Sequence, residues 1–124
     1  MPISLDVLRT HVERELKIIA KSGKTVSYSD LWDRAGYNPK WRRFMGEITG
    51  DISETELSLG NPPISAIVIL ESTGYPSGGF FGLSLADLPT TQRRTTKLQF
   101  KKALTLADRA YIDWKQTEVW RKWR

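Results

Sequence analysis

Apolar side chains recur every three or four residues through most of the chain, and one β-branched run breaks that spacing. After Ser4, a favourable N-cap, the recurring leucine, valine and isoleucine residues predict a helix over residues 5–20 that ends at Ser22-Gly23. Residues 64–70 instead form an almost continuous β-branched run, which predicts a buried strand. The chain is therefore expected to be α+β and mainly helical.

Two further helices are predicted between these segments, and each begins with a recognisable cap. Residues 25–26 form a short extended piece, and Ser27 then caps a two-turn helix that carries Asp30 in its first turn and ends at Gly36. Asn38-Pro39 begins the next helix, because asparagine caps it and proline in the first position loses no hydrogen bond. Its apolar stripe consists of Trp41, Phe44, Met45, Ile48 and Ile52.

This pair of helices has the outline of a helix-turn-helix. Gly50 is expected to end or bend the second helix, with a further short turn from Ser53 to Gly60. Two short helices joined by a tight turn, the second with outward basic residues, are typical of DNA-binding helix-turn-helix units. Residues 80–83 are a second candidate strand, so a wing is expected to follow, with an ordinary hairpin as the alternative. The resulting fold is a winged helix-turn-helix.

A long helix is predicted for the last part of the chain, from about residue 95 to 115 or beyond. The residues that keep its helical period are Phe100, Ala103, Leu104, Ala107, Tyr111 and Trp114. Tryptophans 114, 120 and 123 either dock this helix onto the body or, if exposed, mark a partner interface. We expect a single domain over 1–124, with an N-terminal helix (1–23), a winged helix-turn-helix core (24–83) and a basic, tryptophan-rich C-terminal helix (84–124).

Charge is unevenly distributed along the chain, whose formal net charge is +5. Residues 1–50 carry nine basic and six acidic side chains, residues 51–90 carry none and five, and residues 91–124 carry ten and three. The two basic ends are expected to gather on one surface and attract a polyanion such as nucleic acid. We expect that face to hold Arg42, Arg43, Arg93, Arg94, Lys97, Lys101 and Lys102.

Composition removes several classes of site. The chain has no cysteine and one histidine, His11, so disulfides, thiolate metal sites, cysteine nucleophiles and multi-histidine metal centres are excluded. The longest apolar run is far too short to cross a bilayer, and the first residues lack a basic segment followed by an apolar one. A cytoplasmic protein is therefore the default expectation, associated with the nucleoid if the source is bacterial or archaeal.

Four motifs in residues 24–83 carry a resemblance to a known family. Residues 25–32 read Thr-Val-Ser-Tyr-Ser-Asp-Leu-Trp, and residues 35–46 read Ala-Gly-Tyr-Asn-Pro-Lys-Trp-Arg-Arg-Phe-Met-Gly. Asn-Pro-Pro at 61–63 with Ile-Val at 67–68, and Gly-Tyr-Pro-Ser-Gly-Gly-Phe at 74–80, follow in the same order. This part of the chain resembles the DNA-binding half of the alkylguanine-DNA alkyltransferases and their alkyltransferase-like relatives, which is a winged helix-turn-helix.

The chain departs from that family at its reactive box. Where the family has Pro-Cys-His-Arg, this chain has Pro63-Ile64-Ser65-Ala66, so the acceptor cysteine and its histidine are both missing. Alkyl transfer needs a thiolate nucleophile, and its loss abolishes that reaction. About ten additional residues separate the second helix from the strand, and the basic C-terminal helix has no clear counterpart in the motif. The resemblance therefore implies a fold that docks onto DNA but does not carry out alkyl transfer.

The resemblance also assigns roles to two residues. Arg43 matches the arginine that enters the duplex in place of a flipped nucleotide, and Tyr28 matches the tyrosine that crowds the target phosphate. An inserted guanidinium offsets part of the cost of unstacking a base. The complete expected DNA-binding set is Tyr28, Ser29, Asn38, Lys40, Trp41, Arg42, Arg43, Ser77, Arg93, Arg94, Lys97, Lys101 and Lys102.

The leading prediction is thus a non-catalytic protein that binds double-stranded DNA, without metal or cofactor, and that recognises modified or damaged bases by alkyltransferase-like docking. A protein-interaction module, such as an immunity protein or an adaptor subunit, is the alternative, with a protein partner or a second copy bound through the tryptophan-rich helix. An enzyme is the third hypothesis, in which a set of carboxylates holds a magnesium ion. That set is Asp30, Asp33, Asp51, Glu54 and Glu56.

Overall fold

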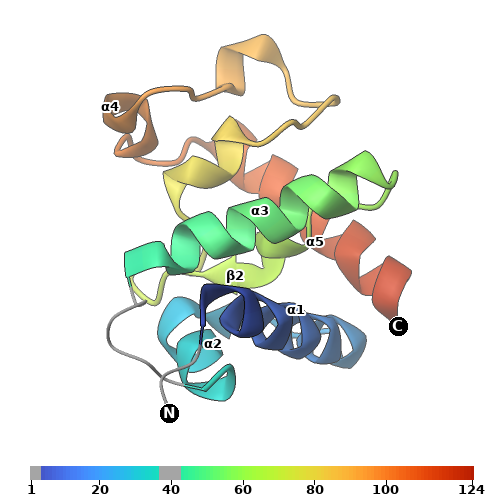
Figure 1. Ribbon diagram of the computed structural model, residues 1–124. Helices are drawn as coiled ribbons and strands as arrows, with labels where there is room; N and C mark the ends of the chain where they lie inside the picture. Colours follow the sequence, from blue (N-terminus) through green and yellow to red (C-terminus); the bar gives the residue numbers. More distant parts are fainter. Residues whose placement is uncertain (1–3, 37–42) are drawn as a thin grey trace.

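The computed structural model describes residues 4–36 and 43–124, and in this part of the chain helices surround one short buried segment (Figure 1). The elements are, in chain order, α1 (Leu5–Ser22), β1 (Val26–Ser27), α2 (Tyr28–Arg34), α3 (Met45–Ser58), the 3-10 helix η2 (Ile64–Ile67), β2 (Val68–Ile69), the 3-10 helices η3 (Gly78–Gly82) and η4 (Thr90–Gln92), α4 (Lys97–Phe100) and α5 (Leu106–Trp123). The expected α+β, mainly helical class is confirmed.

The helix boundaries at the start of the chain agree with the caps expected from the sequence. Ser4 accepts a hydrogen bond from the Val7 amide, and α1 ends at Gly23, whose φ of 71° is a left-handed conformation that glycine adopts without strain. Ser27 accepts from the Asp30 amide and caps α2 in the same way. Both short-range predictions are confirmed, because each cap is decided within a few residues.

Helix α3 is longer than expected and continues without a break through Gly50. The sequence prediction that the helix ends at Gly50 is wrong, because Ile48, Ile52 and Ser53 are buried on both sides of it and keep the helical face continuous. The expected start of this helix at Asn38-Pro39 lies outside the described residues.

The predicted strand over residues 64–70 is only partly present. Val68 and Ile69 form β2, which pairs in parallel with β1, so that Val26 lies opposite Val68. Residues 64–67 are a 3-10 helix instead, and all four are buried. Their backbone finds partners in side chains, since the Ser65 amide donates to Ser53 Oγ at 2.8 Å and Gln116 Nε2 donates to the Ala66 carbonyl at 3.0 Å.

The second predicted strand, residues 80–83, is also wrong. Residues 78–82 form η3, in which the neighbouring Phe80 and Phe81 are both buried. In a strand, adjacent side chains point to opposite faces, so Phe80 and Phe81 would not both face the same core. The only strand paired with β2 in the described residues is β1, and the two-stranded wing is therefore not confirmed.

The long helix predicted over 95–115 is divided into two. Thr96 and Gln99 form a reciprocal cap at the start of α4, and Thr105 and Asp108 form another at the start of α5. The two capping boxes, at residues 96–99 and 105–108, mark two helix starts that the apolar spacing did not reveal. The chain between them turns at residues 101–105.

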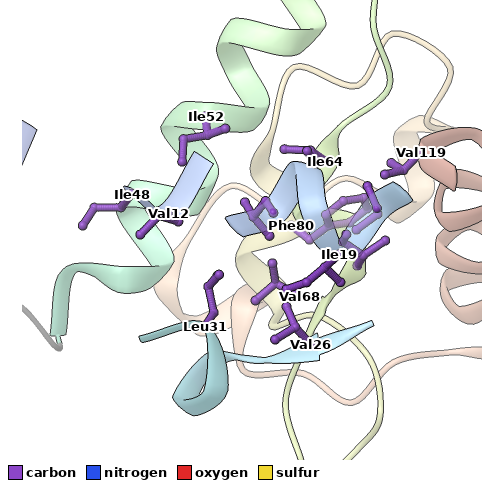
Figure 2. Packing of buried hydrophobic residues seen from close by; sticks show 14 of the residues in the cluster. Val12, Ile19, Val26, Leu31, Ile48, Ile52, Ile64, Val68, Phe80 and Val119 are labelled. Atoms are coloured by element: carbon purple, nitrogen blue, oxygen red, sulfur yellow. The ribbon is translucent and has the colours of Figure 1, made fainter. Parts of the chain in front are cut away.

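The core is one cluster of buried side chains drawn from α1 to α5 (Figure 2). Leu8 and Val119, near opposite ends of the chain, are both fully buried in it. The tail docks onto this body: Trp120 Nε1 donates to the Lys24 carbonyl at 3.0 Å, and Lys17 Nζ lies 4.8 Å from the centre of the Trp123 ring. No helix in the described ranges has the length and apolar character needed to cross a membrane.

The packing of α1 predicts a sharp difference between two of its residues. Leu16 is fully buried, whereas Ile18 on the same helix is 51% exposed. Leu16→Ala is expected to lower the free energy of unfolding by about 3 kcal/mol, because it leaves a cavity in the core. Ile18→Ala, the matched control, should change it by less than about 0.5 kcal/mol. Urea unfolding followed by circular dichroism measures both, and equal losses would contradict the register of α1.

Candidate nucleic-acid interface

A cleft of about 320 Å³ lies between the first turns of α3, the segment around η3 and the end of α4. Its lining includes Tyr28 from α2, Ser65 from η2, Ser77 and Gly78 before and in η3, and Phe100 from α4. Tyr28, Ser77 and Gly78 belong to motifs that carry the family resemblance, whereas Ser65 lies in the segment that replaces the family's reactive box. Segments that are far apart in the sequence therefore contribute to one concave surface.

The polar groups of this cleft are hydroxyls. The Tyr28 hydroxyl lies 3.4 Å from Ser77 Oγ, and the Ser65 hydroxyl accepts a 2.6 Å hydrogen bond from Ser53. Thr49 adds a hydroxyl that donates to the Gly46 carbonyl. None of the described residues that line the cleft is charged, and its walls are otherwise apolar or aromatic. Such a site fits a neutral, flat group better than an ion.

Ser65 lies in the segment that, by the sequence resemblance, stands in place of the alkyltransferase family's reactive box. The residue is 5% exposed, and both its amide and its hydroxyl are bonded to Ser53. No histidine or carboxylate in the described residues hydrogen-bonds to Ser65, so nothing there acts as a general base for its hydroxyl. The Ser65 hydroxyl can bind a group in the cleft but is not activated for attack.

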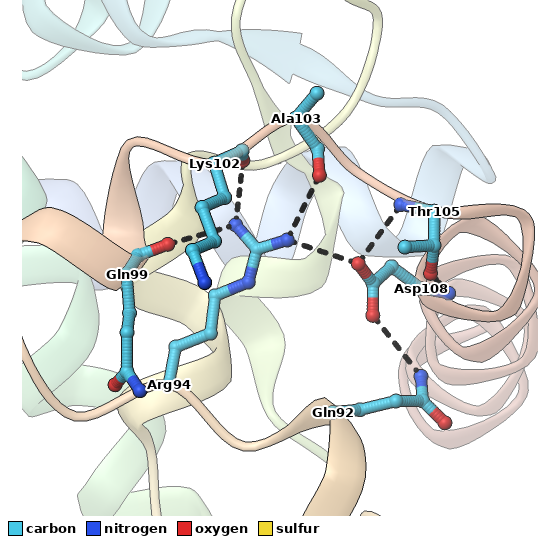
Figure 3. A network of polar contacts seen from close by, with 7 residues as sticks. All are labelled: Gln92, Arg94, Gln99, Lys102, Ala103, Thr105 and Asp108. Carbon is cyan, nitrogen blue, oxygen red and sulfur yellow. Dashed lines mark hydrogen bonds and ion pairs between the residues drawn. The ribbon is translucent and has the colours of Figure 1, made fainter.

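Arg94 does not lie on the surface where the sequence analysis placed it. Its side chain is almost fully buried, and its guanidinium donates to the carbonyls of Gln99, Lys102 and Ala103 and to the Asp108 carboxylate (Figure 3). The Arg94–Asp108 distance is 3.0 Å. The prediction that Arg94 contacts a phosphate is therefore wrong. It binds the chain that surrounds α4.

Asp108 is the acidic partner in this network. Burial alone would raise the pKa of its carboxyl, but hydrogen bonds from Thr105 and Gln92, together with the charge of Arg94, hold the pKa below its ordinary value.

Arg93, the neighbour of Arg94, is half-buried and donates to the carbonyls of Leu83 and Leu85. Both arginines thus join loops to one another and are not free for a ligand.

Three lysines and one arginine of the expected set remain on the surface. Lys97, Lys101 and Lys102 are exposed on α4 and the turn after it, and Arg43 is exposed just before α3. None of the four forms an ion pair with a residue in the described ranges. α4 and the start of α3 lie on the same side of the molecule (Figure 1), and both border the cleft through their own residues.

The position of α4 beside the cleft is fixed by two glycines. A Cβ atom at Gly78 would lie 1.9 Å from the Phe100 carbonyl oxygen, and one at Gly82 would lie 3.0 Å from the Phe100 ring. Only glycine at position 78 lets the two backbones approach this closely. The lysines of α4 are therefore carried on a segment that is packed against the cleft wall.

The other expected residues have different positions. Ser29 Oγ donates to the Glu71 carboxylate at 3.0 Å, which places a negative charge beside a residue expected to meet a phosphate. Asn38, Lys40, Trp41 and Arg42 lie outside the described residues. Sequence reasoning missed Thr49 and Phe100 as parts of the cleft, and only the Thr105-x-x-Asp108 pattern signalled the network around Arg94.

The five carboxylates considered for a magnesium site do not form one metal-binding group in the described residues. Glu56 is buried, accepts from Asn61 at 2.8 Å and lies 3.7 Å from Lys17 Nζ, while Glu54 accepts from the Ser84 amide at 2.7 Å. Nowhere in the described ranges do three histidine, aspartate or glutamate side chains converge as metal ligands would. These contacts give Glu54 and Glu56 structural roles.

The lowered pKa of Asp108 predicts a pH dependence of stability. Its folded-state pKa lies below the unfolded value of about 3.9, so the unfolded chain binds the proton more readily, and the stabilisation is complete at neutral pH and declines as pH falls below about 4. Asp108→Asn is expected to lose about 3 kcal/mol at pH 7, because it leaves a buried guanidinium unpaired, and to lose less than wild type on acidification. Urea unfolding at pH 7 and pH 3 tests this, with the exposed Asp113→Asn as the control. A loss that is the same at both pH values would contradict the ion pair.

Comparisons of the chain with protein-family models, with curated proteins and with solved structures found no match. The resemblance to the alkyltransferase family thus consists of the four motifs in residues 24–83. The geometry adds one independent fact, which is that Tyr28, Gly46 and Ser77 from three of those motifs line the same cleft as Ser65.

Proposed function

We propose that this protein binds duplex DNA without catalysing a reaction and receives an extruded base in the cleft beside η3. The observation that carries the proposal is the convergence of Tyr28, Ser65 and Ser77 on a cleft that exposed lysines border on one side. Recognition of the Watson–Crick edge of a base, which is paired in the duplex, requires the base to leave the stack and enter a pocket of this kind.

The lining of the cleft suits a nucleobase. A base is neutral and flat, carries hydrogen-bonding groups on its edge, and stacks on aromatic and apolar surfaces. Phe80 and Phe100 supply apolar surface, and the hydroxyls of Ser65, Ser77 and Tyr28 supply hydrogen-bonding partners. Without cysteine, the protein would hold such a base and not remove a group from it.

The surrounding cations supply the sequence-independent part of the affinity. Lys97, Lys101, Lys102 and Arg43 are exposed and form no ion pair within the described residues, so they are available for phosphates. Each neutralised phosphate lowers the logarithm of the binding constant by about 0.9 for every tenfold rise in salt. Lesion and shape discrimination would come from the cleft, not from these contacts.

A charge-matched pair of triple variants tests the position of the interface. Lys97→Gln, Lys101→Gln and Lys102→Gln together are expected to reduce the salt slope of duplex binding by roughly 2.7, because three phosphate contacts are lost. The control removes three exposed charges from the ends of α1 and α5, through Lys21→Gln, Arg121→Gln and Lys122→Gln. Fluorescence anisotropy at several salt concentrations measures both. Equal slopes for the two variants would remove α4 from the interface.

Arg43 and Arg42 are expected to behave differently. By the resemblance, Arg43 enters the duplex, so Arg43→Ala should lose the preference for a mismatched or alkylated duplex, in which extrusion is cheapest. Arg42→Ala should weaken binding to intact and mismatched duplexes equally, as the loss of a phosphate contact does. Competition binding with the two duplexes separates these outcomes. If both variants keep the preference, Arg43 is an ordinary phosphate contact.

A protein-interaction module is the second candidate function, and one residue favours it. Trp120 and Trp123 pack onto the body, but Trp114 is 49% exposed, edge-on to Tyr111 and 3.9 Å from Lys115 Nζ. An exposed indole of this kind is common at protein interfaces. Absence of any duplex shift by the wild-type protein at low salt would favour this function over DNA binding.

A further inference from the structure

An exposed leucine stands among the lysines of α4. Leu98 is 75% exposed. The exposed Lys97, Lys101 and Lys102 around it can contact phosphates by themselves, so phosphate binding gives no reason for a leucine at this position. A single exposed leucine on a mobile surface needs no explanation. Leu98 differs from such a leucine because the four-residue helix that carries it is held in place by several contacts.

Three features hold α4 in place. The Arg94 guanidinium binds the carbonyls of Gln99, within the helix, and of Lys102, just after it. The Thr96–Gln99 capping box closes its first turn. Gly78 allows the Phe100 backbone to pack directly on η3. A buried ion pair and a close glycine contact thus fix the segment that presents Leu98.

The surroundings of Leu98 favour DNA as its partner. Phe100, two residues further on, lines the cleft, and the three lysines attract the phosphates on both sides of a base step. DNA-bending proteins insert leucine, isoleucine, methionine or phenylalanine between base pairs and partly unstack them. An apolar side chain on a rigid support inside a basic patch has the properties of such a wedge.

We infer that Leu98 is an apolar wedge that enters the duplex beside the extruded base. Leu98 would act from the α4 rim of the cleft, while Arg43 is placed one turn before Gly46 on the α3 rim. The inference rests on the proposed DNA binding and adds a second point of entry to it. A wedge on this side would hold the gap open after the base has left the stack.

The test uses the full-length protein and a duplex with 2-aminopurine next to a mismatch, because the fluorescence of this base rises when its neighbours unstack. Leu98→Ala is expected to lose the rise and about tenfold in affinity, while its salt slope stays that of wild type. Leu98→Met should keep both the fluorescence rise and the affinity of wild type, since methionine is an apolar side chain of similar size. The control is Leu59→Ala, because Leu59 is 68% exposed and follows the last residue of α3. That end of α3 lies on the side of the molecule away from α4 (Figure 1).

Each outcome has one meaning. If wild type and Leu59→Ala bind with the fluorescence rise and Leu98→Ala does not, the wedge is supported. If all three bind with the same rise, the wedge is overturned and DNA binding stands. If wild type binds no duplex at low salt, the proposed function fails and the wedge fails with it. A lower salt slope for Leu98→Ala would also overturn the inference, because it would mean that the lysines had moved.

Discussion

The fold depends on how one buried stretch of backbone satisfies its hydrogen bonds. Residues 64–68 are buried in the core, away from bulk water, so each amide and carbonyl must find a partner in the protein. Ser53 reaches this stretch from α3, Gln116 reaches it from α5, and β1 pairs with it at Val68. Three elements from different parts of the chain are thereby fixed around the same few atoms, and the apolar clusters of the helices fill the remaining space.

A second polar interaction, the Arg94–Asp108 ion pair, holds the segment from η4 to the start of α5 in place. The chain from η4 to the start of α5 contains little regular structure, and Arg94 and Asp108 close it by binding its carbonyls and its helix cap from inside. A buried ion pair contributes little net stability when compared with apolar packing, but breaking it leaves a buried charge uncompensated, which disfavours other arrangements of the chain. Here the arrangement that keeps the pair intact is the one that sets α4 against η3 at the edge of the cleft.

The parts of the fold that could be predicted are those decided locally. Ser4 and Ser27 cap helices through bonds that span three residues, so sequence spacing was sufficient. The 3-10 conformation of residues 64–67 depends on Gln116, fifty positions away, and no local pattern records that bond. The burial of Arg94 could not be predicted for a similar reason. Its guanidinium binds backbone carbonyls, which every residue type has, so the sequence does not mark these partners. For the site, the motifs indicated Tyr28 and Ser77, whereas Phe100 enters the cleft only through the close approach to Gly78.

The packing of α1 against α5 has a consequence for how the protein is made. Leu8, Val12 and Leu16 are fully buried, and α1 contacts α5 directly, yet α5 is encoded nearly a whole chain length later. A ribosome adds about 5–20 residues each second, so the contact between α1 and α5 forms no sooner than on the order of ten seconds after α1 has been made. Helices form within about a microsecond, and core closure must therefore wait for synthesis rather than for helix formation. That interval is when a chaperone would find the nascent chain most accessible.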